Sequence, residues 1–329
     1  VLPFIGLPTP WLADYFFVLV GLVGFYSFFR MLYLLVASAT RKTDLTPYGR
    51  GSWALVTGST DGIGKAFAES LASQGFNIYM ISRNPQKLKE VASAISEKYR
   101  VTVHSRAWDF SNCASKFDDL VEIIDSDIES KDISILVNNV GVFHFGSFHQ
   151  LSVKEIADYI SVNAMTITYM TRLVLTKLKS REGKSAMINL SSLSSLMVLP
   201  GASMYSATKK FDSAFTKLAR QQLKSSNVVV MNLRPGFVPT NLVNGFLGDS
   251  VGSKSFLDNY LHFGVTAKEC VEGALSDLGL SESFVGSLKH KLQGILRANA
   301  PECILAHFIK WMFLKKNKAL EEKKRSGSS

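Results

Sequence analysis

Short apolar runs alternate with longer amphipathic stretches between Trp53 and Leu233. The short runs are rich in β-branched residues, which is typical of strands, and the longer stretches have the period and length of helices. Because several of the short runs are apolar at nearly every position, we expect a parallel sheet with helices on both faces. The predicted strands are 53–57, 77–82, 101–108, 133–138, 186–191 and 228–233, and the predicted helices include 64–73 and 85–98. The predicted fold class is α/β, a doubly wound parallel sheet.

The first 40 residues have a different pattern. Residues 11–39 are almost continuously apolar, with Asp14 and Arg30 as the charged exceptions. About 20 apolar residues are enough to cross a bilayer, so this stretch predicts a transmembrane segment. A hairpin within one leaflet is the alternative, because Arg30 is unfavourable at mid-membrane. Basic residues follow at Arg41, Lys42 and Arg50. By the positive-inside tendency, they place the next domain in the cytosol.

Beyond Pro235 the pattern becomes irregular. Residues 241–264 are rich in Gly and Ser and predict either a lid over a pocket or a surface loop. Residues 304–314 form an apolar stretch too short to span a bilayer, which predicts an amphipathic, interfacial helix or a hydrophobic dimer face. We therefore expect a membrane anchor at 1–40, an α/β domain at 41–290 and a C-terminal apolar helix with a basic tail at 291–329.

Charge and cysteine content narrow the expected partners. The net charge is +10, and the tail from Lys315 to Arg325 contributes +4 of it. Charge concentrated beside an apolar segment favours lipid headgroups or simple solubility over nucleic acid, which needs basic residues spread along a groove. The cysteines are Cys113, Cys270 and Cys303. They have neither a C-x-x-C pair nor metal-ligand spacing, so we expect unpaired, buried thiols and no metal site.

A glycine-rich turn directly follows the first predicted strand. Its glycines have the spacing G-x-x-x-G-x-G and lead into a predicted helix. Glycine is needed there because the backbone must turn tightly and approach a pyrophosphate, which the amide groups at the helix N-terminus stabilise. The turn therefore predicts dinucleotide binding. The residues expected to contact the cofactor are Gly58, Ser59, Thr60, Asp61, Gly62, Ile63 and Gly64.

The end of the second predicted strand bears on the choice of cofactor. Ser82-Arg83 occupies the place where an acidic residue would bond a ribose 2′-hydroxyl. Arg83 can pair with a 2′-phosphate, which an acidic residue would repel, so we expect NADPH rather than NADH.

Tyr205 and Lys209 are separated by one helical turn. Both side chains therefore project from the same helix face, where the ammonium would lower the pKa of the phenol from about 10. Such a phenol can donate a proton to a ketone oxygen that receives a hydride.

These motifs together resemble the short-chain dehydrogenase/reductase family, which has a Rossmann-type fold. The resemblance rests on the glycine spacing, on Asn138-Asn139-Val140-Gly141, on Asp109-Phe110 and on the Tyr-x-x-x-Lys pair, with Ser192 thirteen positions before the tyrosine. It implies a catalytic tetrad of Asn163, Ser192, Tyr205 and Lys209, in which Asn163 orders a water relay to the lysine. It also implies cofactor contacts from Asp109, Asn139, Tyr205, Lys209, Pro235 and Thr240.

Within the family, the chain is similar to the membrane-bound group of very-long-chain 3-oxoacyl-CoA reductases and 17β-hydroxysteroid dehydrogenases of types 3 and 12. The grounds are 49–53, 60–66, 81–85 and the apolar N-terminal stretch. This similarity implies an NADPH-dependent enzyme of the endoplasmic-reticulum membrane that reduces 3-oxoacyl-CoA in fatty-acid elongation. Its expected partners are a lipid-like substrate, the membrane and a second copy in a homodimer.

Two alternatives remain open. The first is reduction of a steroid 17-ketone, because the expected pocket, formed by 143–148 and 241–264, is apolar enough for either substrate. The second is a non-catalytic, nucleotide-binding membrane scaffold, against which the complete tetrad argues.

Overall fold

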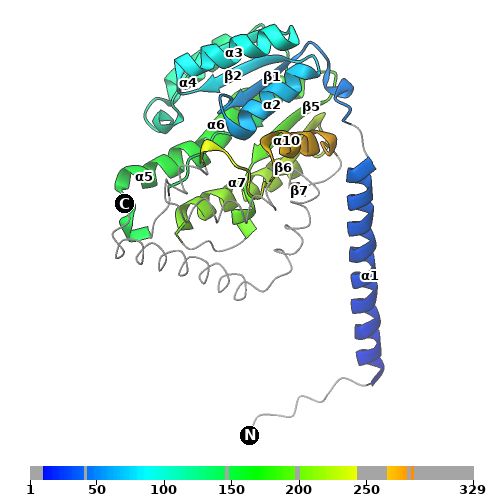
Figure 1. The fold of residues 1–329 in the computed structure, drawn as a ribbon. Helices are drawn as coiled ribbons and strands as arrows, with labels where there is room; N and C mark the ends of the chain where they lie inside the picture. Colours follow the sequence, from blue (N-terminus) through cyan, green and yellow to red (C-terminus); the bar gives the residue numbers. More distant parts are fainter. Residues whose placement is uncertain are drawn as a thin grey trace, which may run out of the picture. The chain divides into compact units, whose positions relative to one another are not determined.

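The computed structural model describes residues 10–40, 43–144, 148–196, 201–242, 265–279 and 283–284 (Figure 1). The chain divides into two compact units, residues 1–42 and residues 43–329, which we describe separately.

In the first unit, the described residues form one helix, α1 (Pro10–Thr40). Large apolar side chains project from it into solvent, among them Tyr15, Phe25 and Tyr33, which are 71%, 64% and 63% exposed. The helix expected from the apolar pattern is therefore present. Among the described residues, however, no helix is both long enough and apolar enough to cross a bilayer. The predicted transmembrane segment at 11–39 is accordingly not supported.

Within the described residues, the second unit is built on a sheet of seven parallel strands in the order β3-β2-β1-β4-β5-β6-β7. The strands are β1 (Trp53–Thr57), β2 (Asn77–Ser82), β3 (Val103–Ala107), β4 (Ile133–Asn138), β5 (Ser185–Leu190), β6 (Val228–Leu233) and β7 (Ser283–Phe284). The chain moves outward from β1 to β3 and then crosses back to β4 beside β1. The strand order thus reverses between β1 and β4, which is where open α/β sheets bind their ligands.

Helices cover both faces of this sheet. One face packs against α2 (Gly62–Ser73), α3 (Pro85–Tyr99) and α10 (Ala267–Ser276). The other packs against α4 (Phe117–Ile128), α6 (Thr166–Ser180) and α7 (Ser203–Gln222). The short helical segments are η1 (Thr46–Tyr48), η2 (Phe110–Asn112), η3 (Phe148–Gln150), α5 (Val153–Asp158), the π-helical η4 (Tyr159–Met165) and η5 (Leu193–Leu196).

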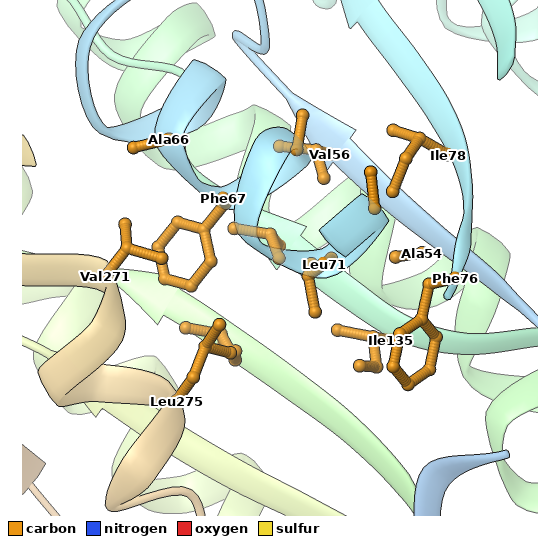
Figure 2. Packing of buried hydrophobic residues seen from close by; sticks show 14 of the residues in the cluster. Ala54, Val56, Ala66, Phe67, Leu71, Phe76, Ile78, Ile135, Val271 and Leu275 are labelled. Carbon is orange, nitrogen blue, oxygen red and sulfur yellow. The ribbon is translucent and has the colours of Figure 1, made fainter. Parts of the chain in front are cut away.

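Successive side chains of β1 point to opposite faces of the sheet, so the hydrophobic core forms two layers, one on each face. Ala54 and Val56 belong to the cluster beneath α2 and α10, whereas Leu55 belongs to the cluster on the opposite face. Figure 2 shows Phe67 of α2 and Val271 of α10 meeting over the first layer. Full burial of such a side chain contributes about 1.5–3 kcal/mol, so both helices are held firmly against the strands that lead into the glycine-rich turn.

The predicted α/β fold is confirmed. Strands β1, β2, β4 and β6 have the bounds expected from the sequence. β3 is shorter than predicted, β5 lies one residue earlier, and β7 was not predicted. The expected lid at 241–264 lies largely outside the described residues, and the expected helix at 304–314 lies wholly outside them.

Two of the three cysteines lie within the described residues. Cys113 and Cys270 are unpaired and fully buried, as predicted. Burial raises the pKa of both thiols, that of Cys270 to about 12, so both remain protonated near neutral pH.

Candidate active site

The glycine-rich turn connects β1 to α2 and leaves little room for a side chain at any of its three glycines. Gly58 and Gly62 have φ of +64° and +51°, in the left-handed region that favours glycine. A Cβ on Gly64 would overlap the carbonyl oxygen of Gly58, because the helix starts directly against the turn. This packing leaves the N-terminus of α2 as a cradle for an anionic group such as a pyrophosphate.

Asn139, just after β4, fastens this turn to the centre of the sheet. Its side-chain amide donates to the carbonyl oxygens of Thr57 (2.9 Å) and Gly58 (3.1 Å). Its backbone N–H donates to the Thr57 hydroxyl (3.0 Å). Asn139 therefore shapes the cofactor cradle by holding the backbone of the turn in place. This contact is a structural role for the second asparagine of the Asn138-Asn139-Val140-Gly141 motif.

The segment after β6 lies over the same turn. A Cβ on Gly62 would approach Cγ2 of Thr240 to 2.7 Å, and the amide of Asn241 donates to the Asp61 carboxylate. Ile63 packs with Val238 in a small apolar cluster. The structure thus brings together the predicted cofactor residues of the turn and Thr240.

Two further predicted cofactor residues, Arg83 and Asp109, lie just beyond the ends of β2 and β3. The hydroxyls of Ser82 and Thr60 are hydrogen-bonded at 2.9 Å, and this bond joins the end of β2 to the turn. Arg83 is exposed, and within the described part of the chain no hydrogen bond or ion pair engages it. Asp109 is also exposed and accepts from the backbone N–H of Ser111 (3.0 Å). Arg83 is therefore available to an anionic ligand.

Tyr205 and Lys209 lie on one face of α7, as predicted. The Lys209 ammonium is 5.9 Å from the centre of the Tyr205 ring. The ring of Phe143, from the loop after β4, packs edge-on against Tyr205 at 4.9 Å and 89°. The phenol is half-buried, with an apolar ring on one side and a cation nearby.

Lys209 is buried at 4% exposure and firmly anchored. Its ammonium donates to the carbonyl oxygen of Leu190 (2.9 Å) and to Oδ2 of Asp212 (2.9 Å). Burial acts to lower the pKa of Lys209, but the negative charge of Asp212 and the nearby Tyr205 outweigh it and raise that pKa. The lysine is thus held in its charged form.

Asn163 lies in the π-helical η4, a type of segment found often at functional sites. Its amide nitrogen donates to the Val142 carbonyl oxygen (3.1 Å) and to the Thr208 hydroxyl (3.0 Å), and its oxygen accepts from the Val142 N–H (2.8 Å). The side chain therefore joins the loop after β4 to α7. The water relay expected from the family resemblance stays a prediction.

Ser192 follows β5 and is half-buried. Its hydroxyl accepts from the backbone N–H of Ser194 (3.1 Å). The hydroxyl of neighbouring Ser191 donates to the Lys209 carbonyl oxygen (2.6 Å), and the Leu193 N–H donates to the carbonyl oxygen of Pro235 (3.0 Å). Ser192 is thus placed on a segment seated between α7 and Pro235.

Two residues that shape the site were not predicted. Asp212 is 1% exposed and bound to Lys209. The only signal in the sequence is its position three residues after the lysine, where the two side chains share a helix face. The Tyr159 hydroxyl donates to the carbonyl oxygen of His144 (2.7 Å) and accepts from its N–H (2.7 Å), which fixes the loop after β4. No spacing pattern indicates this contact.

Comparisons with known proteins agree with this geometry. Residues 52–248 match the family model for short chain dehydrogenases. The chain is 33% identical to very-long-chain 3-oxoacyl-CoA reductase-B of Danio rerio over 84% of this chain and 85% of the relative. It is 34% identical to the human inactive hydroxysteroid dehydrogenase-like protein 1 over 84% of this chain and 80% of the relative. A solved serine dehydrogenase complexed with NADP+ is 26% identical, with a TM-score of 0.60 over 71% of this chain and 93% of that chain.

Family, fold and site lead to one conclusion. The matched region contains both the cofactor cradle and the tetrad residues, and the cradle fits a nicotinamide dinucleotide. One relative is named inactive, so overall similarity alone does not establish catalysis, whereas the position of Tyr205 and Lys209 close together on one face of α7 does support it. The chain belongs to the short-chain dehydrogenase family and is an oxidoreductase acting on CH–OH and C=O groups.

Proposed function

We propose that this protein reduces the ketone of a long-chain 3-oxoacyl-CoA to the alcohol and uses NADPH as the reductant. The observation that carries the proposal is the Tyr205–Lys209 pair on α7, which lies next to the loop after β4 that also fastens the cradle. Lys209 is close to Gly141 of this loop, and Asn139 is hydrogen-bonded to Gly58. The relative from Danio rerio, which aligns over most of both chains, is named for this reaction.

Each tetrad residue has a role in this reaction. A nicotinamide dinucleotide held by the glycine-rich turn would supply the hydride that the ketone carbon accepts. Tyr205 donates its proton to the oxygen on which negative charge develops, and Ser192 donates a hydrogen bond to the same oxygen. Lys209 keeps its positive charge near Tyr205, where it stabilises the negative charge that develops as the proton is transferred. Asn163 holds the loop after β4 against α7, so that Phe143 stays against the Tyr205 ring.

The central experiment measures NADPH oxidation by the purified protein. We expect turnover with a long 3-oxoacyl-CoA and a fall of at least about 10²-fold in Tyr205→Phe, because the proton donor is lost. Tyr169→Phe, a change of the same size on α6, serves as the control. Turnover that persists in Tyr205→Phe rules out the mechanism.

The choice of NADPH rests on Arg83. Its exposed guanidinium at the end of β2 can pair with a 2′-phosphate, and the serine dehydrogenase neighbour was solved with NADP+. In Arg83→Asp we expect the ratio of kcat/KM for NADPH to that for NADH to fall at least about tenfold, while Lys89→Asp on α3 leaves it unchanged. An unaltered ratio in Arg83→Asp removes the argument for NADPH.

Reduction of a steroid 17-ketone is the second candidate. It is favoured by the human relative, whose name refers to hydroxysteroid dehydrogenases. Side-by-side turnover of a 3-oxoacyl-CoA and a 17-keto steroid distinguishes the two candidates. Absence of turnover with both, together with NADPH binding, would favour the non-catalytic scaffold.

We also propose that α1 attaches the protein to the endoplasmic-reticulum membrane, with the α/β domain in the cytosol. The exposed apolar side chains along α1 support lipid contact, and a membrane serves as a reservoir for a substrate with a long apolar tail. We expect the double substitution Phe25→Asp and Phe29→Asp to reduce flotation with phosphatidylcholine vesicles, whereas Leu218→Asp on α7 does not. The homodimer stays a prediction, which light scattering tests.

A further inference from the structure

The Lys209 ammonium is held from two directions. The ammonium donates one hydrogen bond to the Leu190 carbonyl oxygen at the end of β5 and another to Oδ2 of Asp212 on its own helix. An ammonium has three donors, so these two bonds leave one N–H for another partner. The nitrogen lies 3.7 Å from the place that a Cβ on Gly141 would occupy, and Oδ1 of Asn163 lies 3.4 Å from the same place. The third N–H of Lys209 is therefore left for a partner in the space between the loop after β4 and Tyr205.

Asp212 is an unusual residue for a helix packed against a sheet. Its side chain is 2% exposed, Oδ2 binds Lys209, and Oδ1 has no hydrogen-bond partner among the described residues. A buried carboxylate with one unsatisfied oxygen is costly, and a buried ion pair is often no more stable than apolar residues of similar size. Stability of the fold alone therefore does not account for this carboxylate.

The backbone on both sides of the pair is fixed. The Thr216 hydroxyl donates to the Asp212 carbonyl oxygen (2.6 Å), and Asn189 of β5 donates to that hydroxyl (3.0 Å). The Ser191 hydroxyl donates to the Lys209 carbonyl oxygen (2.6 Å). Since neither residue can shift easily along α7, the carboxylate determines where the ammonium lies.

We propose that Asp212 is a positioning residue of the active site, whose carboxylate holds the Lys209 ammonium charged and directs its remaining donor toward Tyr205 and the cofactor. This inference rests on the proposed reductase function and adds to the tetrad a fifth side chain that acts through Lys209. Asp212 itself is expected to touch neither substrate nor cofactor.

The electrostatic environment of the pair is simple within the described residues. On α7, the ionisable groups that act on Lys209 are Asp212 and Tyr205. The other elements contribute neutral groups: the Leu190 carbonyl from β5, the Ser191 hydroxyl directly after β5, and Oδ1 of Asn163 from η4, which lies beside Gly141 as the ammonium does. Without the negative charge of Asp212, burial is the main influence left on Lys209, and it favours the neutral amine.

The test uses the full-length protein and the neutral variant Asp212→Asn. We expect kcat to fall about tenfold at neutral pH with little change in KM for the ketone, a smaller loss than removal of the proton donor itself causes. We also expect the alkaline limb of the kcat profile to move to lower pH by roughly one to three units, because loss of the counter-charge lowers the pKa of the lysine. Asp212→Glu, which retains the charge, should restore most of both properties.

Controls separate this role from a structural one. Asp277→Asn makes the same change at another aspartate that is 1% exposed, beyond the end of α10, and should leave kcat and the pH profile unchanged. Asp212→Ser provides a second neutral variant in case Asp212→Asn does not fold. If a folded neutral variant keeps the wild-type kcat and alkaline limb, the proposal is overturned, even if its melting temperature falls.

A different outcome bears on the proposed function. If the wild-type protein reduces no ketone, the reductase proposal fails, and the pH dependence of NADPH binding, measured by fluorescence, takes the place of turnover. An alkaline limb of binding at lower pH in Asp212→Asn then supports the role of Asp212, and an unshifted limb overturns it.

Discussion

Two buried aspartates of the α/β unit differ in how their charge is compensated. Asp127, on α4, accepts from the Tyr79 hydroxyl (2.6 Å) and from two nitrogens of Arg106 (2.7 and 2.6 Å). Asp212, on α7, has one charged partner, Lys209, and one oxygen without a hydrogen bond among the described residues. Both oxygens of the Asp127 carboxylate are hydrogen-bonded, which we call saturated, whereas only one oxygen of the Asp212 carboxylate is.

The pKa values of the two carboxyls shift in opposite directions. Burial acts to raise both. At Asp127, the hydrogen bonds from Arg106 and Tyr79 outweigh burial and hold the pKa of the carboxyl well below its ordinary value. At Asp212, burial outweighs the attraction of Lys209, and the pKa is raised. We interpret the saturated carboxylate of Asp127 as a stabiliser of the fold, and the incompletely satisfied carboxylate of Asp212 as the positioning residue proposed above.

The largest expected effect comes from Lys209→Met, which removes the partner of Asp212 and the cation near Tyr205. We expect kcat to fall by roughly 10²–10³-fold. We expect a much smaller effect on stability, because Asp212 can take up a proton when its counter-charge is gone. Turnover assays and urea unfolding at neutral pH measure both. Lys210→Met, at the exposed neighbouring position, is the control, and a Lys209→Met variant with near-normal kcat would contradict the functional half of the comparison.

The sequence was sufficient for those parts of the site that depend on local pattern. The glycine-rich turn and the Tyr205–Lys209 pair were predicted because a tight turn and one helix face each leave a short-range signature, whereas Asn139 was expected from the family resemblance. Asp212 could not be recognised in the same way. A polar residue on a helix is usually exposed, and its burial here depends on β5 and η5 packing against α7, which are tertiary contacts that the periodicity of one helix does not reveal.

Dependence on neighbouring elements also explains where the observed strands and helices differ from the predicted ones. Strands with continuous apolar runs, such as β4, were predicted with their bounds because both faces are buried. β3 lies at the edge of the sheet, where only one neighbouring strand defines its length, and the structure shortens it to Val103–Ala107. The π-helical turn at Asn163 was not predicted, because an extra residue in a helix changes the apolar period only slightly.

Asp127→Asn should have an intermediate effect, on stability instead of catalysis. We expect the free energy of unfolding at pH 7 to fall by about 2 kcal/mol, a moderate value because Arg106 is 39% exposed and partly screened. The folded-state pKa of Asp127 is depressed, so its contribution is present above the unfolded value near about 4 and is lost as pH falls below it. Urea unfolding at several pH values should therefore show a weaker acid dependence in the variant. Unchanged acid dependence would contradict the structural half of the comparison.

The smallest expected effects come from two buried tyrosines, one in each region. Tyr79→Phe removes one donor to Asp127 and should cost about 1 kcal/mol of stability without changing KM for the ketone. Tyr159→Phe leaves the backbone of His144 without its partner and should raise this KM a few-fold, because the loop that carries Phe143 is less firmly held. Burial raises the pKa of Tyr159 to about 12, so its hydroxyl stays protonated and the KM effect should be constant from about pH 6 to 9. If Tyr79→Phe alters KM as much as Tyr159→Phe does, the two regions are coupled and the separation between a stabilising and a functional carboxylate no longer holds.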